Sequence, residues 1–294
     1  MDSLGPWLRG LLVLVLLAIG GCDGNDPTTA TNPADALYVC NQAGATISVV
    51  DPSSQSVVTT VDLTNHGFSE DAKPHHVVVE PDGSAWYVSL IGDDRVVKFN
   101  ARNEVVGSVA FQSPGMLSLH PENNLLYAGH TMSIPSVPST IAVIQRSDMT
   151  PVQVPLSVPI DRPHGMKVSP TGEYAYTSSL STNRIVAIDT ETQDVESPVA
   201  LPGSRQRYVQ LDITADGETA FVTGQVAGQV QVLSLQNPAT PSLVDSIDVG
   251  AEPWHPQLSD DGSTLYFGSK ATNTVNVLDT NTFATSTIAG NGLA

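Results

Sequence analysis

Four of the seven histidines stand at matching places in a set of short recurring segments. The segments are Lys73–His76, Ser113–Met116, Arg162–Gly165, Arg207–Gln210 and Glu252–His255, each placed at the start of an apolar run. His75 and His164 fall in one column of this alignment, and His76 and His255 fall in the next. Neutral imidazole is a common ligand of copper and zinc, so histidines that converge from different segments would bind such an ion. Strict strand alternation, however, would turn His75 and His76 to opposite sides.

Other side chains near these segments suit a small ligand. Met116 shares the second column, and its thioether would favour copper. His130 ends a neighbouring aromatic segment and is expected close to the same rim. Arg207, together with Arg205, would orient an anionic ligand, and Trp254 would stack on a ligand. Alternatives stay open for each of these residues. The arginines would lie in a solvated loop, Trp254 would pack between blades, and the histidines would only hydrogen-bond to the backbone.

Catalytic motifs give little support for an enzyme. The chain has no Gly-x-Ser-x-Gly elbow, no phosphate-binding glycine loop, and no CxxC or HExxH motif. A lactonase would need a base with charged partners, and His164 with Arg162, Arg207 and Glu252 would supply them. These charged residues would equally well be solvated side chains at the rim, with no catalytic role.

The charge of the chain excludes one class of partner. Its 294 residues carry 12 Lys and Arg against 30 Asp and Glu, for a net charge of −18. Nucleic acids and anionic lipid head groups are bound through clustered basic residues, which this composition does not supply. A small molecule or another protein is therefore the expected partner.

Turn signals recur along the chain at intervals of 40 to 49 residues. They are Pro81–Gly83, Pro121–Asn123, Pro170–Gly172, Ala215–Gly217 and Asp260–Gly262. An aromatic residue follows the last residue of each turn by four positions: Tyr87, Tyr127, Tyr176, Phe221 and Tyr266. Glycine and asparagine suit tight hairpins because they tolerate positive φ. The chain therefore repeats one structural unit.

Each unit contains four short β-strand patterns. Val77–Val79, Ala85–Ser89 and Val96–Asn100 are examples of the first three, and a more polar fourth strand such as Ser246–Val249 closes the unit. Four strands per unit indicate an all-β fold, a β-propeller of six four-stranded blades. A β-sandwich is rejected because that fold does not require the same spacing between turn and aromatic residue to recur five times. The first unit lacks an inner strand, and either Thr28–Thr31 or Ala289–Ala294 would complete it.

The segment Leu37–Asn41, followed by Ile47–Asp51, resembles the Tyr-Val-Thr-Asn (YVTN) repeat of bacterial propellers, a group within the lactonase-like propellers. This resemblance covers residues 34–288 and implies the fold more strongly than any activity, because the group spans several functions. Locally, Pro163–Gly165 and Pro74–His76 resemble the inner-strand histidine segments of the nitrous oxide reductase propeller, which hold copper. The same Pro-His-Gly segment resembles streptogramin-lyase propellers, which implies His164 as a base. Too few histidines are present for the full reductase ligand set.

The N-terminus has the features of an export signal. Residues 1–21 contain the apolar run Leu11–Ile19, which is too short to span a bilayer and typical of a signal peptide. The run leads to Gly21 and Cys22, which resembles a bacterial lipobox, so we expect lipidation of Cys22, a tether over 22–33 and the propeller over 34–294. Cys40 then remains as the single thiol of the folded part and cannot form an internal disulfide. The expected location is the bacterial cell envelope.

Three functions are compatible with the sequence. The leading one is a lipid-anchored propeller that binds a metal ion, copper or zinc, or a small ligand at a histidine-rich channel mouth. The second is a lactonase- or lyase-type enzyme that uses the same site. The third is a scaffold that docks another envelope protein.

Overall fold

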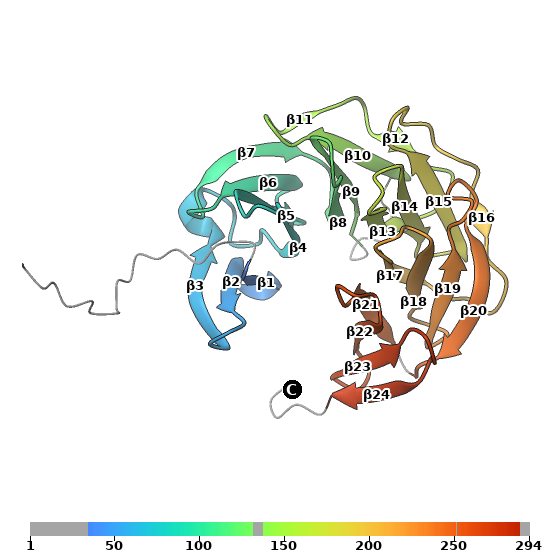
Figure 1. Cartoon of the computed structure of the whole chain (residues 1–294). Coiled ribbons are helices and arrows are strands. Elements are labelled where there is room, and N and C mark those ends of the chain that lie inside the picture. Colours follow the sequence, from blue (N-terminus) through green and yellow to red (C-terminus); the bar gives the residue numbers. More distant parts are fainter. Residues whose placement is uncertain (1–34, 132–137, 251, 289–294) are drawn as a thin grey trace, which may run out of the picture. The chain divides into compact units, whose positions relative to one another are not determined.

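The protein is a β-propeller of six antiparallel sheets, or blades, arranged around a central channel (Figure 1). The computed structural model describes residues 35–131, 138–250 and 252–288. In five of the blades the strands follow one another from the channel outward, each paired with the next in sequence. The expected six-bladed, all-β architecture is thereby confirmed.

The blades have the following strands. Blade 1 is β1 (Leu37–Asn41), β2 (Thr46–Asp51) and β3 (Ser56–Asp62), and blade 2 is β4 (Pro74–Val79), β5 (Ala85–Leu90), β6 (Arg95–Asn100) and β7 (Val105–Ala110). Blade 3 is β8 (Pro114–Leu119), β9 (Leu125–His130), β10 (Thr140–Gln145) and β11 (Thr150–Pro151), with β12 (Leu156–Ser157) also paired to β10. Blade 4 is β13 (Pro163–Val168), β14 (Tyr174–Ser179), β15 (Arg184–Asp189) and β16 (Val199–Ala200). Blade 5 is β17 (Tyr208–Ile213), β18 (Thr219–Gly224), β19 (Gln229–Ser234) and β20 (Ser242–Asp248), and blade 6 is β21 (Pro253–Leu258), β22 (Thr264–Ser269), β23 (Thr274–Asp279) and β24 (Thr285–Ile288). Two short 3-10 helices, η2 (Gln42–Gly44) and η3 (Leu63–His66), lie in and after blade 1.

The hydrophobic core lies between the blades. Each of the five clusters of buried apolar side chains draws its members from two adjacent blades. Trp86 on β5 and Phe99 on β6 stack at 4.1 Å in the cluster that joins blade 1 to blade 2. Because a blade alone would leave both faces exposed to water, this radial packing is what stabilises the sheets.

The repeated aromatic residue links adjacent blades. The hydroxyl of Tyr127 on β9 accepts a hydrogen bond from the side-chain amide of Gln193 in blade 4, with N and O 2.9 Å apart. The hydroxyl of Tyr176 on β14 donates to the carbonyl of Pro238 in blade 5 over 3.1 Å. The fixed offset between turn and aromatic therefore places Tyr127 and Tyr176, both buried and with their hydroxyls paired, at two successive blade interfaces.

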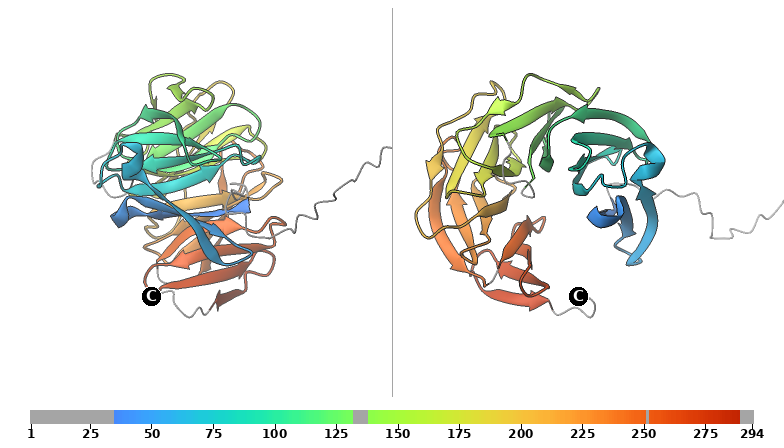
Figure 2. Two further views of the ribbon diagram at one scale, coloured as in Figure 1. Left: turned by 90° about the vertical axis from the view of Figure 1, so that its left-hand side faces the viewer. Right: turned by 180° about the vertical axis from the view of Figure 1, so that it is seen from behind.

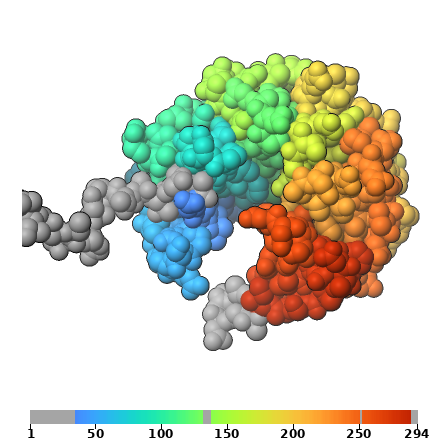
Figure 3. Space-filling model, in the orientation of Figure 1, coloured from blue at the N-terminus to red at the C-terminus, as the bar shows by residue number. Residues whose placement is uncertain are grey.

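Blade 1 differs from the other five. Among the described residues it has three strands and no inner strand, and no hydrophobic cluster joins it to blade 6. Figures 2 and 3 show the resulting break in the ring between the blue and red sheets. Leu37 on β1 and Tyr266 on β22 remain 57% and 41% exposed on the two sides. Thr28–Thr31 and Ala289–Ala294, the two segments predicted to complete blade 1, lie outside the described residues.

The predicted leader, Cys22 and the tether up to residue 33 also lie outside the described residues. Cys40 lies on β1, where burial raises the pKa of its thiol to about 12. The thiol therefore stays protonated at neutral pH, which suits a small packed side chain rather than a nucleophile. A search of the described residues finds no helix with the length and apolar character needed to cross a membrane.

Candidate functional site: histidines in the propeller channel

A residue with left-handed backbone precedes the inner strand of each of blades 2 to 6. These residues, here called the rim, are Lys73, Ser113, Arg162, Arg207 and Glu252, with φ between 48° and 57°. Their carbonyl oxygens accept hydrogen bonds from the backbone N–H groups of Ile91, Thr131, Leu180, Gln225 and Lys270. Positive φ is uncommon and costly for such residues. The repeated left-handed conformation therefore sets the direction in which the chain enters each inner strand.

A β-bulge follows the rim in every one of these inner strands. The register with the neighbouring strand shifts between Pro74 and Val77, Pro114 and Leu117, Pro163 and Gly165, Tyr208 and Leu211, and Trp254 and Gln257. A bulge adds an unpaired residue and redirects side chains. Strict alternation is therefore wrong at His75 and His76, and both rings come near His255.

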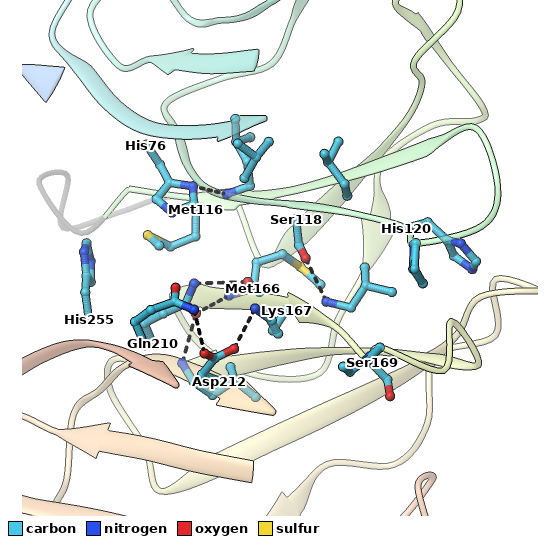
Figure 4. A pocket seen from close by; sticks show the side chains of 18 of the residues that line it. His76, Met116, Ser118, His120, Met166, Lys167, Ser169, Gln210, Asp212 and His255 are labelled. Carbon is cyan, nitrogen blue, oxygen red and sulfur yellow. Dashed lines mark hydrogen bonds and ion pairs between the residues drawn. The ribbon is translucent and has the colours of Figure 1, made fainter. Parts of the chain in front are cut away.

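The four histidines predicted as metal ligands lie together in the channel. Ring centroids are 5.8 Å apart for His75 and His164, and 6.5 Å apart for His75 and His255. The rings of His76 and His255 are 6.4 Å apart. These residues come from β4, β13 and β21, the inner strands of three different blades, and Figure 4 shows His76 and His255 on one side of the channel cavity.

Burial keeps all four imidazoles neutral. It lowers the pKa of His164 to about 3, with the charge of His75 adding to the effect and a hydrogen bond to the His130 backbone opposing it. It lowers the pKa of His75 and of His255 to about 4. The pKa of His76 is held well below its ordinary value by burial and by His255. A neutral imidazole retains a lone pair for a metal ion or a hydrogen-bond donor.

Hydrogen bonds fix which nitrogen holds that lone pair in two of the rings. Nδ1 of His164 lies 2.8 Å from the carbonyl oxygen of His130, and because a carbonyl only accepts, Nδ1 carries the proton. In His76, Nδ1 accepts the backbone N–H of Leu117 over 3.2 Å, so Nε2 carries the proton in the neutral ring. His164 therefore presents an acceptor through Nε2, whereas His76 presents a donor.

Three buried nitrogens of this cluster have no hydrogen-bond partner among the described residues: Nδ1 of His75, Nε2 of His164 and Nε2 of His255. A buried polar atom without a partner costs about 1–3 kcal/mol, so a ligand that satisfies several of them binds favourably. Within the part of the chain that the structure describes, no group of three or more His, Cys, Asp or Glu side chains is arranged to hold a metal ion as it stands. Coordination would therefore need small rotations of the rings.

The channel continues past the histidines as a cavity of about 510 Å³ lined by the inner strands (Figure 4). His76, His255 and the predicted ligand-binding residue Met116 line it. The cavity also holds an ion pair that the sequence analysis missed, between Nζ of Lys167 and Oδ1 of Asp212 at 2.6 Å. Both residues lie on inner strands, two positions after the second histidine column. Their place in the repeat is the sequence feature that could have identified them as channel residues.

Three other predicted ligand residues do not line this cavity, although the His130 carbonyl contacts His164 and the Trp254 ring lies 5.7 Å from the His255 ring. The ring of His130 is fully buried, with Nδ1 2.8 Å from the carbonyl oxygen of Gln112 and Nε2 3.0 Å from the hydroxyl of Thr140. Trp254 lines a separate cavity of about 390 Å³. Arg207 lines a third cavity, of about 490 Å³, beside the rim.

Comparison with known proteins identifies the fold and no closer relationship. No family model matches the chain, and no curated protein matches it. Similar solved structures include a functionally unknown protein from Desulfotomaculum acetoxidans, with 18% identity, a TM-score of 0.72 and coverage of 88% of this chain and 80% of that one. The hydrazine synthase of Kuenenia stuttgartiensis has 18% identity, a TM-score of 0.69 and coverage of 84% and 81%.

Virginiamycin B lyase from Staphylococcus aureus is also similar, with 12% identity, a TM-score of 0.70 and coverage of 87% of this chain and 80% of the lyase. At such low identity a likeness concerns the backbone, and one fold hosts many activities. The membership of the YVTN-repeat group stays a prediction. The comparisons thus show that this chain has the β-propeller fold.

Proposed function

We propose that the channel histidines bind a transition metal ion. The observation that carries this proposal is the set of three buried nitrogens without partners, on His75, His164 and His255. They come from three blades, and each belongs to a ring whose pKa is lowered, so each can offer a lone pair at neutral pH. Proton competition for these ligands is correspondingly weak.

The separation of the rings suits one shared ion after modest movement. A histidine nitrogen lies about 2 Å from zinc, which puts the centroids of two rings on one ion roughly 5–6 Å apart. The observed 5.8 and 6.5 Å are at or just above that range. His76 would donate from Nε2 to a further ligand of the ion, rather than bind the ion itself.

Copper and zinc are the ions that this donor set favours. Imidazole suits both, and the thioether of Met116, which lines the cavity together with His76 and His255, would add affinity for copper(I). A small molecule in the cavity would reach the ion from the side of Met116.

A lactonase- or lyase-type enzyme is the second candidate, because a lyase is among the similar structures. That reaction would use His164 as a base, yet burial lowers the pKa of His164 to about 3. A general base works best when its pKa is near the working pH, so this ring is a weak proton acceptor. Metal binding, which needs the neutral ring, agrees better with the same value.

The proposed location is the bacterial cell envelope, with a lipid on Cys22 as the membrane attachment. This part of the proposal rests on the apolar run before Cys22 and on the polar residues that follow it. The alternative of a scaffold for an envelope protein would use the acidic surface and would need no metal.

Metal analysis of protein purified without a histidine tag tests the proposal. We expect close to one copper or zinc ion per chain, and at least a hundredfold weaker binding in the variant His75→Ala with His164→Ala. The control is His66→Ala, since His66 lies on η3 away from the channel. Wild-type protein that binds neither ion in a direct titration, or a double variant that binds like the wild type, contradicts the proposal.

A further inference from the structure

Three arginines gather at the rim above the histidines. Arg162 and Arg207 hold equivalent rim positions, directly before β13 and β17 of two adjacent blades, and Arg205 lies two residues before Arg207. The charges of Arg207 and Arg205 both lower the pKa of Arg162, after the effect of its own burial. These three side chains are here called the arginine cluster, and Arg205 and Arg207 each lie close enough to Arg162 to act on its charge.

The acidic chain leaves two of these charges without a partner. Of the four ion pairs among the described residues, none involves Arg205 or Arg207. Buried Nε of Arg207 also has no hydrogen-bond partner. With 30 Asp and Glu in the sequence, carboxylates were available for this position, yet Arg205 and Arg207 pair with none among the described residues.

The arginine cluster lies next to the histidine site. Arg162 is two residues from His164, and its charge contributes to the lowered pKa of that ring. His164 is fully buried, and its Nε2 has no hydrogen-bond partner among the described residues, so it offers a ligand a buried acceptor close to Arg162. Arg207 also lines the cavity of about 490 Å³ beside the rim, which has room for a small molecule.

We infer that the arginine cluster binds the anionic group of the ligand that reaches this site, a carboxylate or a phosphate. Guanidinium groups bind both through paired, charge-assisted hydrogen bonds. The inference rests on the proposed function and adds to it the charge of the ligand. Asp248 and Glu252 line the same cavity without pairing to Arg207, so they would repel a second anionic group. The site therefore favours a ligand with one anionic end.

Calorimetric titration of metal-free protein with inorganic phosphate and with acetate, at constant ionic strength, tests the inference. We expect saturable binding of one anion per chain, weakened at least tenfold by Arg207→Asn and abolished in the variant Arg162→Asn with Arg207→Asn. Asparagine is chosen because it tolerates the left-handed backbone of both positions. Tighter binding of acetate assigns a carboxylate, and tighter binding of phosphate assigns a phosphate.

Lys73→Asn is the matched control. Lys73 is also a cationic rim residue with left-handed backbone, but its Nζ pairs with Asp71 at 2.8 Å. Its removal should weaken anion binding less than threefold. Equal weakening by Lys73→Asn and Arg207→Asn would overturn the inference, because the effect would then come from the general charge of the rim.

Zinc binding is measured in the same proteins so that the two proposals fail separately. Wild-type protein that binds zinc and neither anion overturns the inference alone. Wild-type protein that binds an anion through the arginine cluster and no metal overturns the proposed function alone. If the double variant unfolds, Arg207→Lys replaces it: the charge stays, the paired hydrogen bonds are lost, and binding should weaken severalfold.

Discussion

One ring nitrogen of His164 is committed to the backbone and the other is not. The His130 carbonyl holds the proton on Nδ1, and burial lowers the pKa of the ring to about 3. The chain thus keeps a buried acceptor that no protein group satisfies. At the scale of single residues, the site consists of such neutral, oriented imidazoles.

Their burial makes stability depend on pH. In the unfolded chain a histidine titrates near its ordinary pKa of 6.5, whereas His75, His164 and His255 titrate at about 4, 3 and 4 in the folded protein. Between these values the unfolded chain binds more protons, so stability is complete above pH 6.5 and is lost as the pH falls toward 4. Each unit of difference is worth about 1.4 kcal/mol per group.

Denaturant unfolding from pH 7.5 to pH 4.5 measures this loss. The midpoint for His164→Asn should fall less steeply with decreasing pH than that of the wild type, because Asn keeps a donor for the His130 carbonyl and does not titrate. His66→Asn serves as the control and should leave the slope unchanged. Parallel curves for the wild type and His164→Asn would contradict the pKa lowering described for His164.

At the scale of elements, the bulge in each inner strand directs the histidines. β8 shows how closely this region is packed. A Cβ on Gly115 would lie 2.3 Å from the backbone oxygen of His130, and the Gly115 carbonyl accepts the hydroxyl of Ser89 on β5 over 2.7 Å. The His130 backbone packs directly against Gly115, and Ser89 of the neighbouring blade bonds to the Gly115 carbonyl. β8 therefore has little freedom to shift.

Gly115→Ala should therefore destabilise the protein by about 2–3 kcal/mol through overpacking against backbone. It should also weaken metal binding, because the displaced β8 carries the Leu117 N–H that orients His76. Chemical denaturation and metal titration are the measurements. The matched control is Gly44→Ala in η2, where the nearest atom to the added Cβ is 3.7 Å away. Equal effects of the two substitutions would show that the close approach at Gly115 is unimportant.

At the scale of the whole molecule, polar bridges join adjacent blades around the ring. Nη1 of Arg146, after β10 of blade 3, pairs with Oε2 of Glu80 in blade 2 at 2.6 Å, and both side chains are largely buried. The other carboxylate oxygen of Glu80 accepts the hydroxyl of Tyr87 over 2.7 Å. Lys98 on β6 donates to the Arg146 carbonyl over 2.7 Å. Blades 2 and 3 are thus joined by these polar contacts as well as by their apolar core.

Arg146→Met should lower the free energy of unfolding by about 3 kcal/mol, because it leaves the buried carboxylate of Glu80 without its cation. Adding Glu80→Gln should recover part of the loss by removing the buried charge. The control is Arg102→Met, whose pair with Glu104 is 75% and 57% exposed and should contribute little. Unfolding in denaturant measures all three variants. A loss in Arg146→Met no larger than in Arg102→Met would rule out this role.

The sequence by itself determined the repeated unit, the six blades and the segments that carry the histidine columns. These features are local: a turn such as Pro170–Gly172, followed by Tyr176 at a fixed offset, specifies a hairpin with an aromatic residue on its second strand wherever it occurs. Residues at the same or the next place in equivalent blades then reach a similar level of the channel, which is why His75, His164 and His255 could be grouped in advance.

The tertiary structure decided the features that depend on contacts between segments distant in sequence. The bulges bring His75 and His76 to the same neighbour, the His130 backbone sets the tautomer of His164, and Lys167 meets Asp212 only across two blades. Strand periodicity describes one strand at a time, whereas register shifts, burial and hydrogen-bond partners arise when blades pack. For that reason the sequence predicted which histidines converge, and the fold alone decided which of their nitrogens is free to bind.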